Sequence, residues 1–253
     1  MATKLSDIYN FIDSFAPYNT QCEWDNSGIT VGSKYDSVNK IGFALDVTSE
    51  VIDEAIKYGC DLVFTHHPAI FRPIYEIDST SAIHKAIMNN INLICAHTNL
   101  DNSETGVNYV LANLLGLTDT YKLRTESEAS VCRLGDISPV NAKVFSEMIS
   151  NILCTTVKYA DAGNIIKKVA VCGGAGGEFI FEAKANGADA LVTGEIKHHE
   201  YLAAKEIGIS VFCAGHYETE YPIIDFVKKL IEKQFDIECV ILKQSKPTEI
   251  TGV

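Results

Sequence analysis

Three apolar runs of this chain are each followed by a histidine and, within a few residues, by other side chains able to bind a metal ion. The runs are 62–64, 93–95 and 211–213, and the side chains after them are His66 and His67, His97 and Asp101, and His216 and Glu220. Neutral imidazole nitrogens and carboxylate oxygens are the usual protein ligands of zinc, iron and manganese. Ligand sites of open α/β sheets form at strand ends. The pattern therefore predicts a metal site there, with enough ligands for two ions.

The adjacent pair His66 and His67 is the sharpest local signal. Successive side chains of a strand point to opposite faces, so two histidines at a strand end can reach two different ions. Pro68 follows them, prevents further strand pairing and fixes the loop. The alternative is one packed and one solvated histidine. The ligand residues after the other two runs favour the metal role.

His216 and Glu220 are spaced i, i+4. If a helix begins at this loop, both side chains lie on one helix face, a spacing suited to chelation. Glu218 is a competing ligand, but it would point off that face. The alternative is a helix-start histidine beside an unrelated surface glutamate. We expect His216 and Glu220 to be the ligands.

Two cations a few ångströms apart repel each other strongly unless an anionic group bridges them. A carboxylate can bridge in this way, and Asp101 and Glu220 are both candidates for the bridge. His97 lies close to Asp101 in the sequence. Histidines near a metal commonly orient its ligands or relay protons, and imidazole titrates near neutral pH. We therefore expect His97 to support catalysis rather than to bind metal.

Other polar residues are weaker candidates. His84 lies in an expected helix and is interpreted as structural, whereas His198 or His199, which follow Thr193-Gly194-Glu195, are candidates for substrate contact. The glycine-rich run 173–177 lies where a strand would meet a helix. It has neither the Gly-Lys-Ser/Thr end of a P-loop nor a full dinucleotide-binding pattern. A phosphate contact and a tight turn both remain open for this run.

An internal duplication organises the chain. An offset of 128 residues aligns residues of similar type, as in Ile41 with Val169, Glu54 with Glu182, Gly59 with Gly187, Asp61 with Asp189 and Thr65 with Thr193. A third strand of each copy, ending at Cys95 and Cys213, follows at an offset of 118. Apolar strands that alternate with helices predict largely parallel sheets covered on both faces.

The duplication predicts the architecture. We expect an α/β fold with two similar lobes, residues 1–125 and 126–253, that form one domain over 1–253, with the metal site at strand ends in the cleft between the lobes. Residues 121–165 are interpreted as a less regular connection, in which the apolar spacing over 140–153 predicts an amphipathic helix.

Composition limits the class of protein. The 253 residues carry a formal net charge of −12, which disfavours binding to phosphate backbones, so nucleic acid is not an expected partner. No apolar stretch approaches the ~18 residues that span a bilayer. The eight cysteines include no Cys-x-x-Cys pair, and several lie in apolar runs. Reduced thiols and the lack of an apolar signal-peptide core predict a cytoplasmic protein.

Several phrases occur together in one order along nearly the whole chain. They are Glu23-Trp24-Asp25-Asn26-Ser27-Gly28, Ala44-Leu45-Asp46-Val47-Thr48, Thr65-His66-His67-Pro68, His97-Thr98-Asn99-Leu100-Asp101, Cys172-Gly173-Gly174-Ala175-Gly176, Thr193-Gly194-Glu195 and Gly215-His216-Tyr217-Glu218-Thr219-Glu220. In these phrases the chain resembles the Nif-three-like dinuclear metal centre proteins, whose bacterial members are often labelled GTP cyclohydrolase 1 type 2 homologues. Its length resembles the compact form without an inserted domain.

The resemblance implies a ligand set and an assembly. Two metal ions would be bound by His66, His67, Asp101, His216 and Glu220. The chain would form a ring-shaped homohexamer, a trimer of dimers, with its metal sites facing an inner cavity. Glu195 stands where family members often have an aspartate, and the longer side chain departs from that pattern.

These observations predict a metal-dependent hydrolase of a small molecule. The substrate would be GTP, another nucleotide or a phosphate ester, with His97 as proton shuttle and zinc, iron or manganese as the two divalent ions. The alternative is a non-catalytic metal-binding or regulatory hexamer. An open coordination position for water is the feature that distinguishes a catalytic site.

Overall fold

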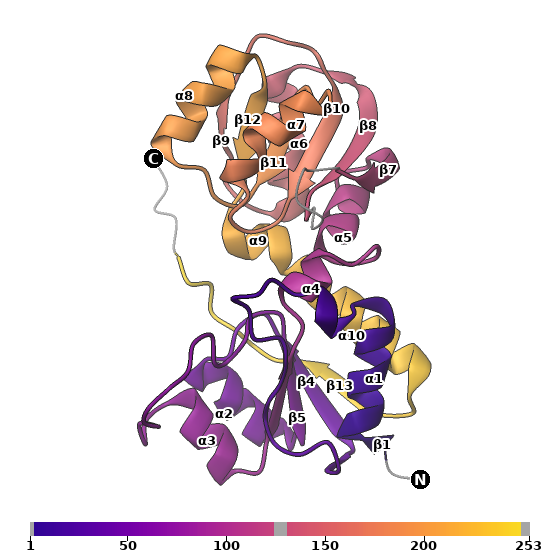
Figure 1. Cartoon of the computed structure of the whole chain (residues 1–253), viewed down its shortest axis with the longest axis vertical. Coiled ribbons are helices and arrows are strands. Elements are labelled where there is room, and N and C mark those ends of the chain that lie inside the picture. The colour runs from indigo at the N-terminus through magenta and orange to yellow at the C-terminus, as the bar shows by residue number, and fades with distance from the viewer. Residues whose placement is uncertain (1–2, 124–130, 249–253) are drawn as a thin grey trace. The chain divides into compact units, whose positions relative to one another are not determined.

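The computed structural model describes residues 3–123 and 131–248 of the chain. The chain divides into two compact units, which are described separately (Figure 1). Residues 3–103 and 223–247 belong to the first unit, and residues 104–123 and 131–222 belong to the second. The predicted lobe boundary between residues 125 and 126 lies outside the described residues.

The first unit is built on a five-stranded sheet of order β13-β4-β5-β6-β2. Its strands are β2 Gly28–Val31, β4 Lys40–Ala44, β5 Leu62–Thr65, β6 Asn92–Cys95 and β13 Glu238–Ile241. The pairings from β13 to β6 are parallel, and β2 joins β6 antiparallel at the edge. A separate two-stranded sheet joins β1 Thr3–Lys4 to β3 Ser37–Val38.

Helices cover this sheet on both sides. Helices α2 Ser49–Tyr58 and α3 Ala82–Met88 pack on the face that bears Val63 and Leu93. Helices α1 Leu5–Phe15 and α10 Pro222–Gln234 lie on the other side of the sheet (Figure 1). Two short helices complete the unit, 3-10 helix η1 Tyr18–Thr20 and α4 Thr98–Asp101. Residues that alternate along each strand therefore reach two different cores.

The second unit has a six-stranded sheet of order β7-β8-β10-β11-β12-β9. Its strands are β7 Thr118–Lys122, β8 Arg133–Val140, β9 Lys158–Ala160, β10 Ile166–Cys172, β11 Ala190–Thr193 and β12 Ser210–Cys213. The pairings of β10 with β11 and of β11 with β12 are parallel, and the outer pairings are antiparallel. The sheet thus has a parallel centre and antiparallel edges.

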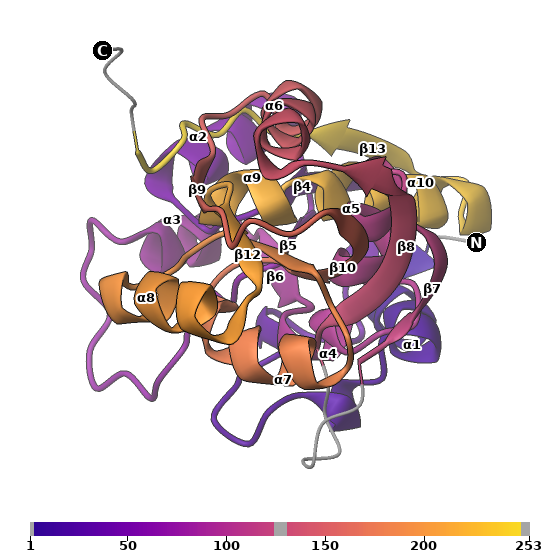
Figure 2. The same ribbon diagram turned by 90° about the horizontal axis from the view of Figure 1, so that it is seen from above.

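Alternate residues of the second sheet again supply two cores. Val171, Val192 and Phe212 pack with helices α5 Val107–Leu114 and α6 Ala142–Leu153. Cys172 and Leu191, which point the opposite way, pack with α7 Ile180–Ala185 and α8 His198–Ile207. Figure 2 shows α7 and α8 on one side of the strands and α5 and α6 on the other. The remaining helices are 3-10 helix η2 Gly177–Phe179 and α9 His216–Glu220.

The predicted α/β class and the internal duplication are confirmed by strand register. Ile41 lies opposite Leu62 in the first sheet, and Val169 lies opposite Ala190 in the second, both at the offset of 128. The pairing of Leu62 with Asn92 recurs as Ala190 with Ser210, since the offset of the third strand is 118. Both units therefore build the same parallel three-stranded core.

One sequence interpretation is wrong. Residues 131–165 are not an irregular connection, because they contain β8 and β9, which pair at two places in the second sheet. Helix α6, predicted over 140–153, is confirmed at Ala142–Leu153. Among the described residues, no helix is both long enough and apolar enough to span a membrane.

Substitution of Gly42, in β4, tests how the segment after β13 packs against β4. A Cβ atom on Gly42 would lie 2.6 Å from a methyl carbon of the buried Leu242 side chain. We expect Gly42→Ala to lower the free energy of unfolding by ~1–3 kcal/mol, as overpacking does in well-packed cores.

Denaturant unfolding measures this change, with the double variant Gly42→Ala, Leu242→Val as control. The smaller valine relieves the clash, so the double variant should lose less than the sum of the single losses. Strictly additive losses would contradict the described packing.

Candidate metal centre

His66 and His67 lie directly after β5, where the sequence predicts ligands. His66 is buried, and its Nδ1 lies 2.8 Å from the carbonyl oxygen of Ala96, just after β6. A carbonyl oxygen only accepts hydrogen bonds, so Nδ1 carries the hydrogen and donates it. The acceptor lone pair of the His66 ring is therefore on Nε2.

His67 is oriented by a carboxylate that follows β4, the strand on the other side of β5. Its Nδ1 lies 2.6 Å from Oδ1 of Asp46, which follows β4. Gln244, beyond β13, fixes this carboxylate. Its Oε1 accepts from the backbone N–H of Leu45 at 2.9 Å and of Asp46 at 3.3 Å, and its side-chain amide donates to Asp46 Oδ2. A residue near the far end of the chain thus holds the group that orients His67.

His97 is oriented by Asp25, whose side chain has no solvent exposure. Asp25 Oδ1 lies 2.8 Å from His97 Nδ1, and Oδ2 accepts from the Thr98 hydroxyl at 2.5 Å and the Thr98 N–H at 3.0 Å. Burial alone would raise the pKa of Asp25, but the hydrogen bonds from His97 and Thr98 outweigh burial and hold this pKa well below its usual value. Asp25 is thus a fixed anion.

The three rings lie together in the first unit. Their centroids are 5.0 Å apart for His66 and His67, 5.2 Å for His66 and His97, and 5.5 Å for His67 and His97. One ring nitrogen from each lies within 4.8 Å of those of the other two, close enough for them to hold a metal ion. Asp101, at the end of α4, places Oδ1 3.7 Å from His66 Nε2.

The second unit holds His216 and Glu220 on one face of α9, as the i, i+4 spacing predicts. His216 Nε2 lies 3.1 Å from Oε2 of Glu220, which is buried. Two ligands that each lie ~2.1 Å from one ion are themselves ~3 Å apart, so this spacing suits a shared ion. His216 Nδ1 lies 2.8 Å from Oε1 of Glu195, after β11.

Gly174 packs directly against the side chains of His216 and Glu220. A Cβ atom there would lie 2.2 Å from Glu220 Oε1 and 3.1 Å from His216 Nε2, and its φ of +64° also favours glycine. The backbone N–H groups of Gly173, Gly174 and Gly176 already donate to side-chain oxygens within the unit. The glycine-rich run therefore forms a tight turn that packs against His216 and Glu220.

The structure also places the weaker sequence candidates. The carboxylate of Glu218 lies over Gly215, off the face shared by His216 and Glu220. His84 lies in α3, as expected. His198 and His199 are exposed at the start of α8.

Sequence reasoning did not assign roles to the residues that orient the histidines. These are Asp25, Asp46, Glu195 and Gln244. Asp46 follows a buried strand, so the rule that predicts the ligands could also have found it. Gln244 carries no such signal, because it reaches Asp46 across 198 residues of sequence.

All four histidines share one arrangement. Each donates Nδ1–H to an oxygen acceptor and presents Nε2, which is how metal-binding histidines are commonly oriented. With the carboxylates of Asp101 and Glu220, the donors are nitrogen and oxygen atoms that suit zinc, iron or manganese. The residues fit a divalent metal ion.

Comparison with known proteins identifies the family of the chain. The family model described as Duf34/NIF3 (NGG1p interacting factor 3) matches residues 3–247. The chain belongs to the Duf34/NIF3 family. The predicted resemblance to Nif-three-like proteins is therefore confirmed.

Relatives in the NIF3 family match over almost their whole length. A Clostridium perfringens protein named GTP cyclohydrolase 1 type 2 homolog is 33% identical over 255 residues, which cover 96% of this chain and 97% of that protein. The structure of Staphylococcus aureus protein SA1388 superposes with a TM-score of 0.92 at 26% identity, covering 99% of this chain and 100% of that one. Reduced HcgD from Methanocaldococcus jannaschii superposes with a TM-score of 0.83 at 31% identity, covering 96% and 99%.

The link from Gln244 through Asp46 to His67 predicts an effect on metal affinity. Replacing Asp46 by alanine removes the acceptor that orients the ring. We expect Asp46→Ala to weaken divalent metal binding by about 10- to 100-fold, as loss of such orienting partners typically does. Competition with a chelator of known affinity measures the change.

Glu50 offers a matched control. It accepts hydrogen bonds from Ser245, next to Gln244, but no histidine bond to it is found in the described structure. Glu50→Ala should leave metal affinity close to wild type. Equal affinity of Asp46→Ala and wild type would contradict the orienting role.

Proposed function

We propose that the chain is a metal-dependent hydrolase that binds two divalent ions through five side chains. Three are in the first unit, His66, His67 and Asp101, and two are in the second, His216 and Glu220. The observation that carries the proposal is the shared orientation of the histidines, each with Nδ1 held by an oxygen acceptor and Nε2 presented. Such uniform orientation is typical of metal ligands. Zinc, iron and manganese all suit these donors.

Bound divalent cations make water acidic enough to ionise near neutral pH and polarise phosphoryl or carbonyl oxygens. The chain's own residues supply binding and proton transfer. Asp101 and Glu220 add the negative charge that offsets two cations. His97, held by the anionic Asp25, keeps its hydrogen on Nδ1 and can accept a proton at Nε2. We assign His97 as the catalytic proton relay.

The substrate is proposed to be a small molecule, either a nucleotide such as GTP or another phosphate ester. Relatives at 33% identity carry the name GTP cyclohydrolase 1 type 2 homolog, which supports the nucleotide class. The net charge of −12 disfavours a nucleic acid as partner. The assembly is proposed to be a homohexamer, a trimer of dimers.

The location is proposed to be the cytoplasm, where thiols stay reduced. The eight cysteines are present as thiols in the described structure. Burial raises the pKa of Cys60 to about 11 and that of Cys95 to about 12, so these thiols are protonated and unreactive at neutral pH.

Metal content per chain tests the ligand set. We expect about two ions in wild type and fewer than one in Asp101→Ala and in Glu220→Ala, because each variant removes a carboxylate that offsets the cations. Mass spectrometry of protein prepared with metal under aerobic and anaerobic conditions measures the content. His84→Ala, a histidine of α3, is the control and should retain both ions.

Fewer than one ion in wild type under both conditions would contradict the proposal. If Asp101→Ala lost metal and Glu220→Ala kept two ions, Glu220 would not be a ligand.

Hydrolysis tests the catalytic part. We expect metal-loaded wild type to hydrolyse GTP or a simple phosphate ester, and His97→Gln to lose about 10²- to 10⁴-fold in kcat, the usual contribution of a positioned acid–base group. Metal content should be unchanged in His97→Gln, and His84→Gln should keep full activity.

Loss of metal from His97→Gln would make His97 a ligand and contradict the relay role. A metal-loaded wild type that hydrolyses none of these substrates would favour the non-catalytic metal-binding protein.

A further inference from the structure

Two aromatic side chains form an exposed pair beside the histidine cluster of the first unit. Trp24 is 59% exposed and Phe71 is 45% exposed, and their ring centroids are 5.5 Å apart. Each ring also meets His97 nearly edge to face, at 6.0 Å from Trp24 and 5.9 Å from Phe71. Aromatic side chains beside convergent polar groups are typical of the lining of small-molecule sites.

Hydrogen bonds fix the segments that carry this aromatic pair. Asn26, two residues after Trp24, donates its side-chain amide to the carbonyl oxygen of Ile70 at 2.7 Å. Ile70 directly precedes Phe71, so this bond ties the two aromatic segments together. Asp25, between Trp24 and Asn26, is anchored to Thr98 and His97. The segments that carry the two rings are therefore held by hydrogen bonds, so the rings need little ordering before they bind a partner.

We propose that Trp24 and Phe71 bind the planar heteroaromatic ring of the substrate beside His97. This inference rests on the proposed function, and it names the residues that select the substrate's ring. Purines and related heterocycles stack on aromatic side chains through their π faces. Because both side chains contact His97, a ring stacked on them lies next to the proposed proton relay.

A small planar ligand fits this surface better than a second copy of the chain does. The two rings come from separate loops that converge on an imidazole of the proposed site, and not from a helix or sheet face. Aromatic rings beside a reacting group can hold a flat substrate while its polar substituents reach the metal ligands.

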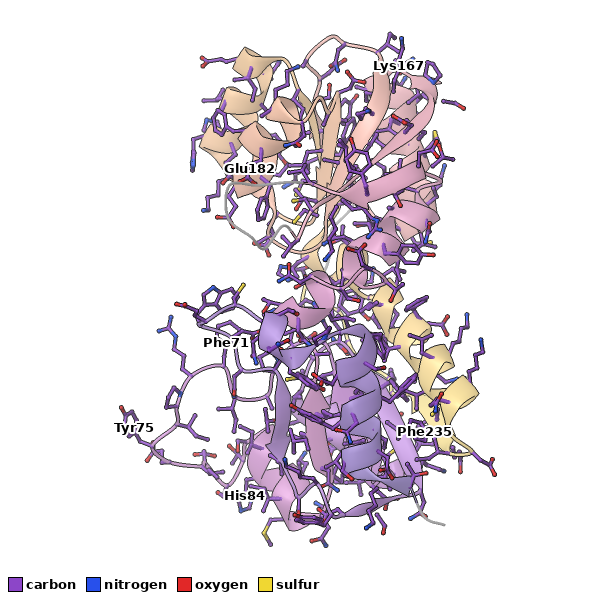
Figure 3. All side chains as sticks on the ribbon, turned by 45° about the vertical axis from the view of Figure 1, so that its right-hand side comes forward. Phe71, Tyr75, His84, Lys167, Glu182 and Phe235 are labelled. Atoms are coloured by element: carbon purple, nitrogen blue, oxygen red, sulfur yellow. The ribbon has the colours of Figure 1, made fainter. Side chains whose placement is uncertain are left out.

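The same loop supplies a matched control residue. Tyr75 is fully exposed, four residues after Phe71. Figure 3 shows Tyr75 at the outer edge of the loop, pointing away from Phe71. Its removal takes away an exposed aromatic ring of similar size from the loop without touching the aromatic pair.

The proposal is tested by comparing the binding of ligands that carry a heteroaromatic ring with the binding of a ligand that lacks one. The probes are GTP, ATP and inorganic triphosphate, titrated by calorimetry into metal-loaded and metal-free protein. The variants are Trp24→Leu, Phe71→Leu, the double variant and Tyr75→Leu, with metal content and oligomeric state recorded for each. Trp24 is the one tryptophan of the chain, so its fluorescence also reports ring binding in wild type, Phe71→Leu and Tyr75→Leu.

We expect GTP and ATP to bind wild type more tightly than triphosphate and to quench Trp24 fluorescence. The double variant should lose roughly tenfold or more of its affinity for both nucleotides, with unchanged affinity for triphosphate and unchanged metal content. Tyr75→Leu should behave as wild type.

Equal binding of nucleotides and triphosphate by wild type would overturn the proposal, as would unchanged nucleotide affinity in the double variant. A double variant with altered oligomeric state and wild-type nucleotide affinity would assign the pair to a subunit contact and also overturn it. Failure of the proposed metal site has a separate readout, the metal content of wild type. If wild type bound no metal, tighter binding of GTP and ATP than of triphosphate by metal-free protein would still support the role of the aromatic pair.

Discussion

The hydrogen bond through Nδ1 of each strand-end histidine is the constraint on which the site depends. In every case the acceptor lies just before or just after a neighbouring strand of the same sheet. Asp46 after β4 and Ala96 after β6 hold His67 and His66 on either side of β5. The sheet order therefore determines which group orients each ring, and a change of order would separate the rings from their acceptors.

The antiparallel edge strand β2 likewise brings an acceptor to a histidine. Asp25 precedes β2, and Gly28 at the start of β2 lies opposite Cys95 at the end of β6. Because β2 runs antiparallel, the segment before it reaches the edge of the sheet where β6 ends and where His97 precedes α4. A parallel strand at this position would carry Asp25 to the other end of the sheet. This topology also brings Trp24 beside His97.

The two copies of the duplicated unit have diverged at this edge. At the offset of 128, His66 and His67 correspond to Gly194 and Glu195. A Cβ atom at Gly194 would lie 2.6 Å from the carbonyl oxygen of Gly174 and from Cα of His216, so the second copy uses this position for close packing. Glu195, which follows β11, orients His216, and β11 is the strand next to β12. The same position after the middle strand thus carries two histidines in one copy and a histidine-orienting carboxylate in the other.

Much of this arrangement follows from the sequence, because apolar runs and the residues after them are visible as patterns. The duplicated strands, their offsets and the shared face of His216 and Glu220 were predicted in this way. Strand β8 was not, because Gly135 and Pro139 interrupt its apolar pattern and it is only half buried. The role of Gln244 was also invisible, since it depends on the parallel docking of β13 beside β4.

The most direct test of the central claim is a crystal structure of the metal-loaded protein with anomalous scattering recorded at the metal edge. We expect metal peaks at bonding distance, ~2.0–2.2 Å, from Nε2 of His66, His67 and His216, with their Nδ1 atoms still hydrogen-bonded to Ala96, Asp46 and Glu195. Metal bound at any of these Nδ1 atoms, or no metal at these side chains, would contradict that claim.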